Sequence, residues 1–190
     1  FRHFTVGSDI DLAHELKLLD WPRYVIKPTI SANSLQTIVA EGPPSAEVQE
    51  LARQILTRSG LLVQPFFEEV PRHGEWSLMF SGDELSHAVI KLPKPGDFRS
   101  QPDHGATVQP AEPSAHVIAQ ARAALAAAPQ RPVYARVDGF LRDGSLQLIE
   151  LELIEPFLFL NHTDQRAAAD KFRDAILTAL QKARPVRERR

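Results

Sequence analysis

The chain has 190 residues, 43% of them hydrophobic, enough for a sizeable core in one domain or in one large and one small lobe. Its formal net charge of −2 argues against a general nucleic-acid-binding surface, and no apolar run approaches the length of a membrane span. The lack of cysteine excludes disulfides and thiol chemistry, and it weakly favours a cytoplasmic location. Because the chain begins at Phe1, we expect a fragment or a processed chain.

The first predicted elements are a strand, a helix and a second strand. Residues 24–27 form a short strand that ends at Pro28, because proline has no backbone donor. A helix starts near Ser45 and is closed by Gly60, and a buried strand follows over residues 61–64. The apolar residues of this helix fall at helical spacing: Val48, Leu51, Ala52, Ile55 and Leu56.

Two hairpins are predicted in the second half of the chain. Residues 76–81 and 85–91 flank Gly82-Asp83, which is a strong turn signal. Residues 133–141 and 146–154 form a second hairpin around Asp143-Gly144. This mixture of helices and antiparallel hairpins indicates an α+β fold.

Three further segments complete the prediction. Residues 92–113 are rich in Pro, Gly, Asp and His, and we expect a functional loop there. Residues 116–128 form an Ala-rich helix, and residues 163–182 form an amphipathic helix before a basic, solvated tail at 184–190. The side chains expected to face inward from the last helix are Phe172, Ala175, Ile176, Ala179 and Leu180.

A row of acidic residues in the second hairpin carries the strongest functional signal. Asp138 lies on the first strand of the hairpin, and Glu150 and Glu152 lie two residues apart on the second. Because side chains alternate along a strand, Glu150 and Glu152 face the same side of the sheet. Burying such a row without a cation would be costly. Carboxylates with no His or Cys among them suit Mg2+ or Mn2+ rather than zinc.

The order and spacing of several short segments resemble the ATP-grasp superfamily, in particular its glutathione-synthetase-like branch of carboxylate-amine ligases. The resemblance covers residues 23–160. The segments that carry it are Val25-Ile26-Lys27-Pro28, Val63-Gln64-Pro65-Phe66, Gly74-Glu75, Lys91, Phe98-Arg99, Asp138, and Glu150 to Pro156.

The resemblance implies a role for each matching position. Lys27 would reach the nucleotide phosphates, and Glu75 would accept hydrogen bonds from the ribose. The hinge that pairs with the adenine edge would be formed by Gln64, Pro65, Phe66 and Phe67. Lys91 and Arg99 would hold the terminal phosphate and the acyl phosphate formed from it.

The resemblance also implies the reaction and its cofactors. Asp138, Glu150 and Glu152 would hold Mg2+ or Mn2+, and ATP would activate a small-molecule carboxylate for attack by an amine. The implied organisation is a remnant of the first lobe with the hinge over residues 1–66, a second lobe over 67–182, and a tail over 183–190. We expect no nucleic-acid or membrane partner, and a homodimer is compatible with the sequence.

Two other functions stay open at this point. The loop over residues 29–34 lacks the glycines that usually close over phosphates, which favours a non-catalytic nucleotide-binding relative. A plain interaction module is the second alternative, although such a module needs no buried row of acids.

The metal hypothesis can be tested from backbone geometry, because it requires Asp138 and Glu150 to face the same side of the sheet. A regular two-residue Asp143-Gly144 loop would send Glu150 to the face opposite Asp138. We therefore expect an odd-length loop, or a bulge elsewhere in the hairpin that has the same effect and sets Arg136 opposite Glu152.

Overall fold

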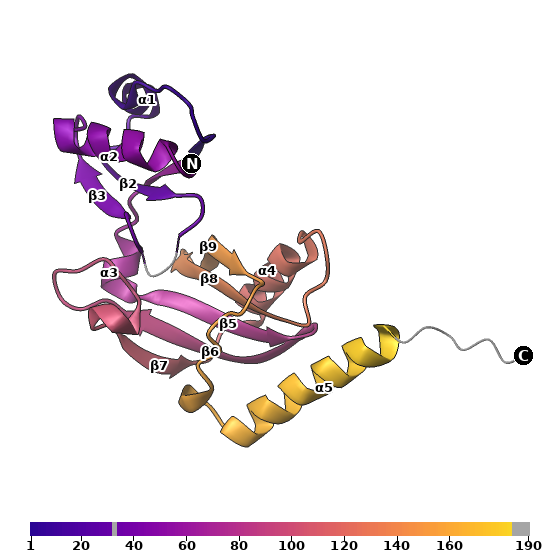
Figure 1. Ribbon diagram of the computed structural model, residues 1–190. Coiled ribbons are helices and arrows are strands. Elements are labelled where there is room, and N and C mark those ends of the chain that lie inside the picture. The colour runs from indigo at the N-terminus through magenta and orange to yellow at the C-terminus, as the bar shows by residue number, and fades with distance from the viewer. Residues whose placement is uncertain (32–33, 184–190) are drawn as a thin grey trace, which may run out of the picture. The chain divides into compact units, whose positions relative to one another are not determined.

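The structure, a computed structural model, describes residues 1–31 and 34–183 (Figure 1). Its internal contacts divide the chain into two units, Phe1–Glu68 and the part that begins at Glu69. Each unit has its own sheet and its own hydrophobic core. The predicted basic tail and two residues of the predicted loop, Ala32 and Asn33, lie outside the described residues.

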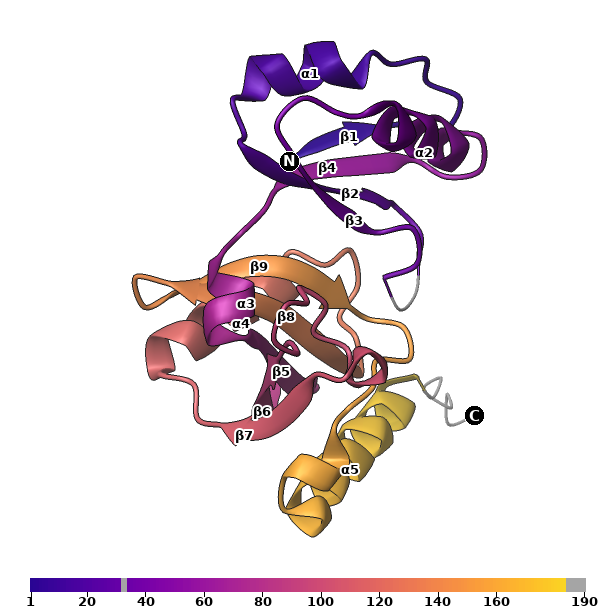
Figure 2. The ribbon, with the colours of Figure 1, turned by 90° about the vertical axis from the view of Figure 1, so that its left-hand side faces the viewer.

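Unit 1 is a four-stranded antiparallel sheet in the order β1-β4-β2-β3, with α1 and α2 on one face (Figures 1 and 2). Its elements are β1 (Arg2–Phe4), α1 (Leu12–Leu19), β2 (Arg23–Pro28), β3 (Ile38–Glu41), α2 (Ala46–Leu56) and β4 (Leu61–Pro65). The sequence predicted β2, α2 and β4, whereas β1, α1 and β3 were not anticipated.

Helix α2 begins where the sequence predicts and ends earlier. The Ser45 side chain caps its N-terminus by accepting a hydrogen bond from the Val48 amide. The helix ends at Leu56, and its C-cap Thr57 stays in the right-handed region. Gly60 therefore does not close the helix as predicted. Its missing side chain instead makes room for the Phe4 carbonyl, which a Cβ would approach to 2.8 Å.

Unit 2 is built on a five-stranded antiparallel sheet in the order β7-β6-β5-β8-β9. The two predicted hairpins supply four of its strands, β5 with β6 and β8 with β9. Its strands are β5 (Glu75–Ser81), β6 (Glu84–Leu92), β7 (Thr107–Ala111), β8 (Tyr134–Arg142) and β9 (Ser145–Glu152). Strand β7 corrects the prediction of one continuous loop over residues 92–113, because it adds to the edge of β6 despite Pro110.

The helices of unit 2 are α3 (Glu69–His73), α4 (Ala115–Ala126) and α5 (Gln165–Ala183), with short 3-10 turns η1 (Pro102–His104) and η2 (Leu160–His162). Helix α4 packs against β8 and β9, and its buried Val117, Ala121 and Leu125 join the main core of the unit. Within residues 1–31 and 34–183, no helix has the length and apolarity that crossing a membrane requires.

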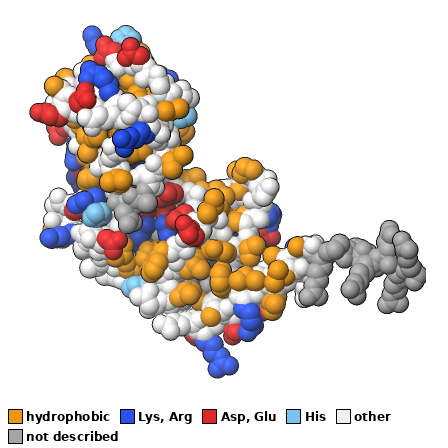
Figure 3. Space-filling model, viewed as in Figure 1, with side chains coloured by type: hydrophobic (Ala, Val, Ile, Leu, Met, Phe, Trp, Pro, Cys, Tyr) orange, Lys and Arg blue, Asp and Glu red, His pale blue; other side chains and the backbone are white. Residues whose placement is uncertain are grey.

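Helix α5 differs from its predicted packing. Among its described residues only Ala168 is buried, and Ile176 and Leu180 are 37% and 57% exposed rather than inward. Phe172 does face the unit, with its ring edge-to-face against Tyr134 at 5.0 Å between centroids. Hydrophobic side chains consequently gather on the visible surface of α5 (Figure 3).

The turn between β8 and β9 confirms the second of the two predicted solutions. The loop has two residues, Asp143 with φ of 51° and Gly144 with φ of 76°, between the paired Arg142 and Ser145. Farther along, the register shifts beside Gly139, and Ile149 is the extra residue of a β-bulge. The bulge places Glu150 opposite Asp138 on the same face of the sheet, as the metal hypothesis requires.

Candidate active site

Lys27 and Gln64, two of the residues predicted to bind the nucleotide, share one face of the unit 1 sheet. Tyr24 and Ile26 of β2 enter the core beneath the helices, so alternation directs Val25 and Lys27 to the opposite face. In the neighbouring strand Gln64 pairs with Val25 and therefore lies on that same face. Lys27 is half-buried, and no carboxylate in the described part of the chain forms an ion pair with it.

The predicted hinge lies where β4 leaves the sheet. Gln64 and Pro65 pair with β2, whereas the pairing of β1 with β4 reaches only to Val63. The Phe66 amide donates to the Arg23 carbonyl at 3.0 Å, and the Arg23 guanidinium lies 4.1 Å from the centre of the Phe66 ring. These contacts hold the end of β4 in an extended conformation.

The second group of predicted residues gathers on one face of the unit 2 sheet. Leu78, Ala88 and Val137 point toward α4, so alternation directs the residues between them to the other face. That opposite face carries one cluster of charged side chains: Glu75 of β5, Lys91 of β6, Arg136 and Asp138 of β8, and Glu150 and Glu152 of β9.

Lys91 is the buried cation at the centre of this cluster. Its ammonium donates to Glu75 at 2.6 Å and lies 3.7 Å from Asp138, and the three side chains are 6%, 13% and 1% exposed. Burial by itself would lower the pKa of Lys91, but the adjacent Glu75 and Asp138 carboxylates outweigh it and the pKa is raised. Lys91 therefore stays charged at neutral pH.

Glu75 was predicted to bind ribose, but its carboxylate is held against Lys91 inside the cluster. A ribose bound by Glu75 would therefore share this carboxylate with a buried lysine. The contact between Glu75 and Lys91 could have been suspected from the predicted hairpin, in which the two residues are cross-strand partners.

Arg136 is the second cation of the cluster. Its Nε donates to both carboxylate oxygens of Asp138, at 3.0 and 2.9 Å, and another nitrogen forms an ion pair with Glu152. Asp138 is fully buried and also accepts a hydrogen bond of 2.6 Å from the Ser77 hydroxyl, which the sequence reasoning did not single out. Arg136 faces Glu152 across the hairpin as the parity argument predicted.

The cluster has more negative than positive charge. Four carboxylates face two cations, which leaves an excess of two negative charges. Glu150 shows the consequence, because burial and then the nearby Asp138 and Glu152 carboxylates raise its pKa above the ordinary value of 4.5. A further cation at this face would relieve that repulsion.

This donor set fits a divalent cation in charge and chemistry. Asp138, Glu150 and Glu152 offer only oxygen atoms, as Mg2+ and Mn2+ prefer, and Asp138 stands directly opposite Glu150. Within residues 1–31 and 34–183, however, no three Asp, Glu or His side chains are gathered as a metal-binding group. The Arg136 guanidinium instead forms ion pairs with both Asp138 and Glu152.

Arg99, the other predicted phosphate ligand, is held by a neighbour. Its guanidinium donates to Asp97 through Nε at 3.0 Å and through Nη2 at 2.7 Å, and the same carboxylate accepts the Phe98 and Arg99 amides. The hydrogen bonds from Arg99 hold the pKa of Asp97 well below its usual range. Arg99 is therefore oriented by its own loop, and the structure does not bring it into contact with the buried cluster.

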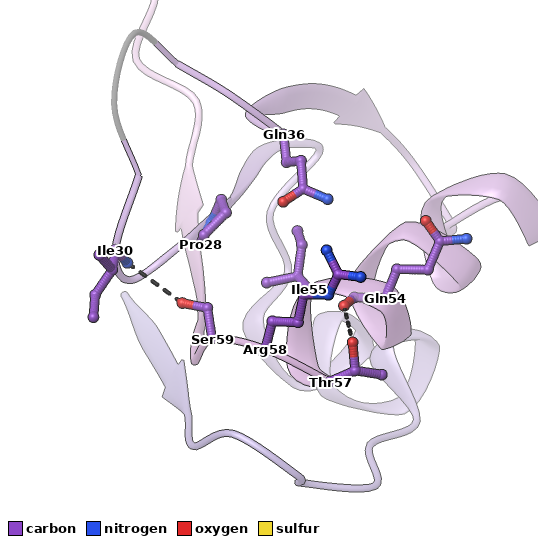
Figure 4. Close-up of a pocket in the computed structure, with 8 residues that line it drawn as sticks. All are labelled: Pro28, Ile30, Gln36, Gln54, Ile55, Thr57, Arg58 and Ser59. Carbon is purple, nitrogen blue, oxygen red and sulfur yellow. Dashed lines mark hydrogen bonds between the residues drawn. The ribbon is translucent and has the colours of Figure 1, made fainter.

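A separate pocket of about 480 Å³ lies in unit 1, beside the C-terminal end of α2 (Figure 4). Polar side chains of Gln36, Gln54 and Arg58 line it together with Pro28. None of the predicted nucleotide, phosphate or metal residues contributes to its lining.

The comparisons with known proteins agree with this fold. No protein-family model matches the chain. The sequence is 34% identical over 165 residues to the cycloserine biosynthesis protein DcsG of Streptomyces lavendulae, with 76% of this chain and 51% of that protein covered. The crystal structure of D-cycloserine synthetase DcsG matches with a TM-score of 0.78 and 28% identity over 94% of this chain and 64% of that one.

More distant structures share the fold. The D-alanine–D-alanine ligase of Bacillus anthracis, solved with ATP, has a TM-score of 0.68 at 16% identity and covers 95% of this chain and 60% of its own. The ATP-grasp ligase PsnB, solved with Mg and ADP, has a TM-score of 0.61 at 15% identity, and the match covers 93% of this chain and 52% of PsnB. The chain belongs to the ATP-grasp superfamily, and it spans about half the length of the curated relative that it matches.

Proposed function

We propose that this chain is the ATP-binding part of a carboxylate-amine ligase that works through an acyl-phosphate intermediate. The observation that carries the proposal is the charged cluster on β5, β6, β8 and β9, with its excess of two negative charges around Asp138, Glu150 and Glu152. The similarity to D-cycloserine synthetase supports a ligase, and that relative is longer than this chain.

In unit 1 the proposed nucleotide ligands are those on the face opposite the helices. Lys27, whose ammonium forms no ion pair with a carboxylate of residues 1–31 and 34–183, would contact phosphate. The backbone from Gln64 to Phe67 extends past the last residue that pairs with β1, where it can pair with an adenine edge. The carboxylate that accepts hydrogen bonds from the ribose is proposed to be Glu75, as the family resemblance implies, with Lys91 holding the same carboxylate in place.

In unit 2 the proposed roles follow from charge. Glu150 and Glu152 would hold Mg2+ or Mn2+ together with Asp138, and that cation would neutralise phosphate charge during phosphoryl transfer. Lys91, fixed by Glu75, places a permanent positive charge within the cluster. Arg99, oriented by Asp97, supplies a planar fork suited to an anionic phosphoryl group.

This chemistry needs no protein nucleophile. The carboxylate substrate attacks the terminal phosphate of ATP, ADP leaves, and the acyl phosphate is then attacked by an amine with release of phosphate. The protein has to position the reactants and balance their charge, which cationic side chains and metal-binding carboxylates can do.

The test is to trap the intermediate. The chain is incubated with ATP, Mg2+, hydroxylamine and a panel of small carboxylic and amino acids, and ADP and hydroxamate are measured together. We expect one class of carboxylate to give both products in equal amounts, and Arg99→Ala to lower both rates by roughly 10²–10³-fold. Stoichiometric ADP release without hydroxamate from any carboxylate would contradict an acyl phosphate.

A second function is favoured by one observation. The loop over residues 29–34 contains no glycine, so a tight backbone cradle for phosphates is harder to form. A non-catalytic ATP-grasp-like domain would bind ATP and release no ADP. Nucleotide binding and ADP release, measured on the same preparation, separate the two functions.

A further inference from the structure

Arg136 makes more contacts than a simple counter-ion of the acidic cluster. It bonds both oxygens of Asp138, forms an ion pair with Glu152, and donates from Nη1 to the Phe157 carbonyl at 3.0 Å. Its guanidinium carbon lies 5.7 Å from the centre of the Phe159 ring. The side chain thereby ties two proposed metal ligands to the segment that follows β9.

That segment is backbone-strained on both sides of the carbonyl that Arg136 holds. Glu155 has φ of 50° and Phe159 has φ of 49°, left-handed values that cost energy for side chains of this size. The Leu158 carbonyl between them accepts a 2.8 Å hydrogen bond from His87 of β6, and the Phe159 ring packs on Met79 and Val89. The conformation of residues 155–159 is therefore imposed by contacts with the sheet.

We propose that Arg136 is an internal competitor for the cation site, and that its release from Asp138 and Glu152 loosens residues 155–159. The proposal rests on the proposed function, because it takes Asp138, Glu150 and Glu152 as the cation ligands. Arg136 occupies lone-pair positions on Asp138 and Glu152 that a divalent cation would also use, so the two compete for these oxygens. Where a cation displaces Arg136 from them, the bond from Arg136 to the Phe157 carbonyl is lost with it.

A competitor and a supporting residue predict opposite effects on cation affinity. If Arg136 only supported the two carboxylates, its removal would weaken cation binding. If it competes, Arg136→Gln removes both the occupant and a positive charge, and we expect Mn2+ to bind the full chain at least about threefold more tightly. Arg173→Gln removes an equally charged side chain from α5 and is the matched control, with unchanged affinity expected.

The experiment measures Mn2+ binding by calorimetry and by the electron paramagnetic resonance of free Mn2+, with hydrogen exchange of residues 153–160 alongside. We expect Mn2+ to speed exchange in this segment of the wild-type chain, and Arg136→Gln to show fast exchange before Mn2+ is added. Should Arg136→Gln not fold, Arg136→Lys keeps the charge without the fork and should still bind Mn2+ more tightly than wild type.

Glu150→Gln separates failure of this inference from failure of the proposed site. If Glu150→Gln binds Mn2+ as well as wild type, the proposed cation site is wrong and the inference falls with it. If Glu150→Gln loses Mn2+ binding while the Arg136 variants bind Mn2+ equally or more weakly than wild type, the site stands and competition by Arg136 is refuted.

Discussion

At the scale of single residues, the site depends on how buried charges are matched. Lys91 forms ion pairs with Glu75 and Asp138 in a region where water contributes little, and its hydrogen bond to Glu75 supports them. The pKa of Glu150 is raised instead, because burial and the neighbouring Asp138 and Glu152 carboxylates disfavour its charged form. Two predictions follow from this contrast.

Replacing Lys91 by methionine should destabilise unit 2 by roughly 3–5 kcal/mol, because the Glu75 and Asp138 carboxylates would stay buried without their cation. Urea unfolding at pH 7 measures the change. Lys94→Met is the matched control on the exposed loop nearby, and it should alter the free energy of unfolding by less than about 0.5 kcal/mol. Equal stability of the two variants would mean that the buried ion pairs contribute nothing.

Replacing Glu150 by glutamine should stabilise the chain in the presence of a chelator. A carboxyl whose folded-state pKa is raised favours the folded state below its ordinary pKa of 4.5, and that contribution is lost as pH rises through the folded-state value. The gain from Glu150→Gln should therefore be present at pH 7–8 and absent near pH 4. Thermal melts at both pH values test this, and a Tm below that of wild type at pH 8 would contradict it.

At the scale of secondary-structure elements, two β-bulges decide which side chains reach the site. The extra residue Ser86 in β6 puts Lys91 opposite Glu75, and the extra residue Ile149 in β9 puts Glu150 opposite Asp138. Without the bulge in β6, Lys91 would face the core beneath α4, and without the bulge in β9, Glu150 would do so. The bulges are thus as necessary to the site as the charged residues themselves.

The bulge in β9 depends on close approach at Gly139. A Cβ at this position would lie 2.3 Å from the Gln147 carbonyl oxygen, which is backbone and cannot move aside. Gly139→Ala should cost about 1–3 kcal/mol and weaken Mn2+ binding, because the strands must separate where the register shifts. Gly144→Asn in the turn, where a Cβ meets nothing, is the control: its φ of 76° adds backbone strain of about 1 kcal/mol, but it should leave Mn2+ affinity unchanged.

Helix α5 provides a second test at this scale. Leu180 is 57% exposed although the helical pattern placed it inward, whereas Phe172 contacts Tyr134. Leu180→Lys should therefore leave stability within about 0.5 kcal/mol of wild type, and Phe172→Ala should cost about 1–3 kcal/mol. If chemical denaturation shows the reverse order, the helix packs by its other face.

These elements also show how far the sequence carries. Periodicity and turn chemistry predicted both hairpins. A metal shared by Asp138 and Glu150 required either an odd-length loop or a bulge, and the structure contains the bulge, at Ile149. The position of the bulge was not predictable, because it depends on Gly139 meeting Gln147 across the strands. Strand β7 was missed since its Pro110 and the polar residues around it read as a loop, and only pairing with β6 makes it a strand.

The site residues divide in the same way. The residue types and their order along the chain predicted Lys27, Lys91, Asp138 and Glu150 as site residues. Their interaction partners were not predicted, because they follow from the pairing of the strands. Ser77 and Asp97 were not recognised, because a serine in a strand and an aspartate in a turn have no distinctive pattern until they bond Asp138 and Arg99. Burial of a lysine, as at Lys91, is also a property that only the folded sheet reveals.

At the scale of the whole molecule, the chain consists of two units with separate cores. The core residues of unit 1 lie between Leu12 and Val63, and those of unit 2 lie between Leu78 and Ala168. A piece spanning residues 69–183 should therefore fold by itself, with the antiparallel sheet intact and with Mn2+ binding retained. Far-ultraviolet circular dichroism and a cooperative thermal melt of this piece check the expectation, which an unfolded or non-cooperative piece would contradict.

The central claim, that this chain binds ATP together with a divalent cation, is tested most directly by thermal unfolding of the full 190-residue chain under three conditions: alone, with ATP and chelator, and with ATP and Mg2+. A ligand at about 100 times its dissociation constant stabilises the folded state by roughly 2.7 kcal/mol. The account predicts a clear rise in Tm with ATP and Mg2+, a smaller rise with chelator, and a reduced rise in Lys27→Ala. Identical melting curves under all three conditions would contradict it.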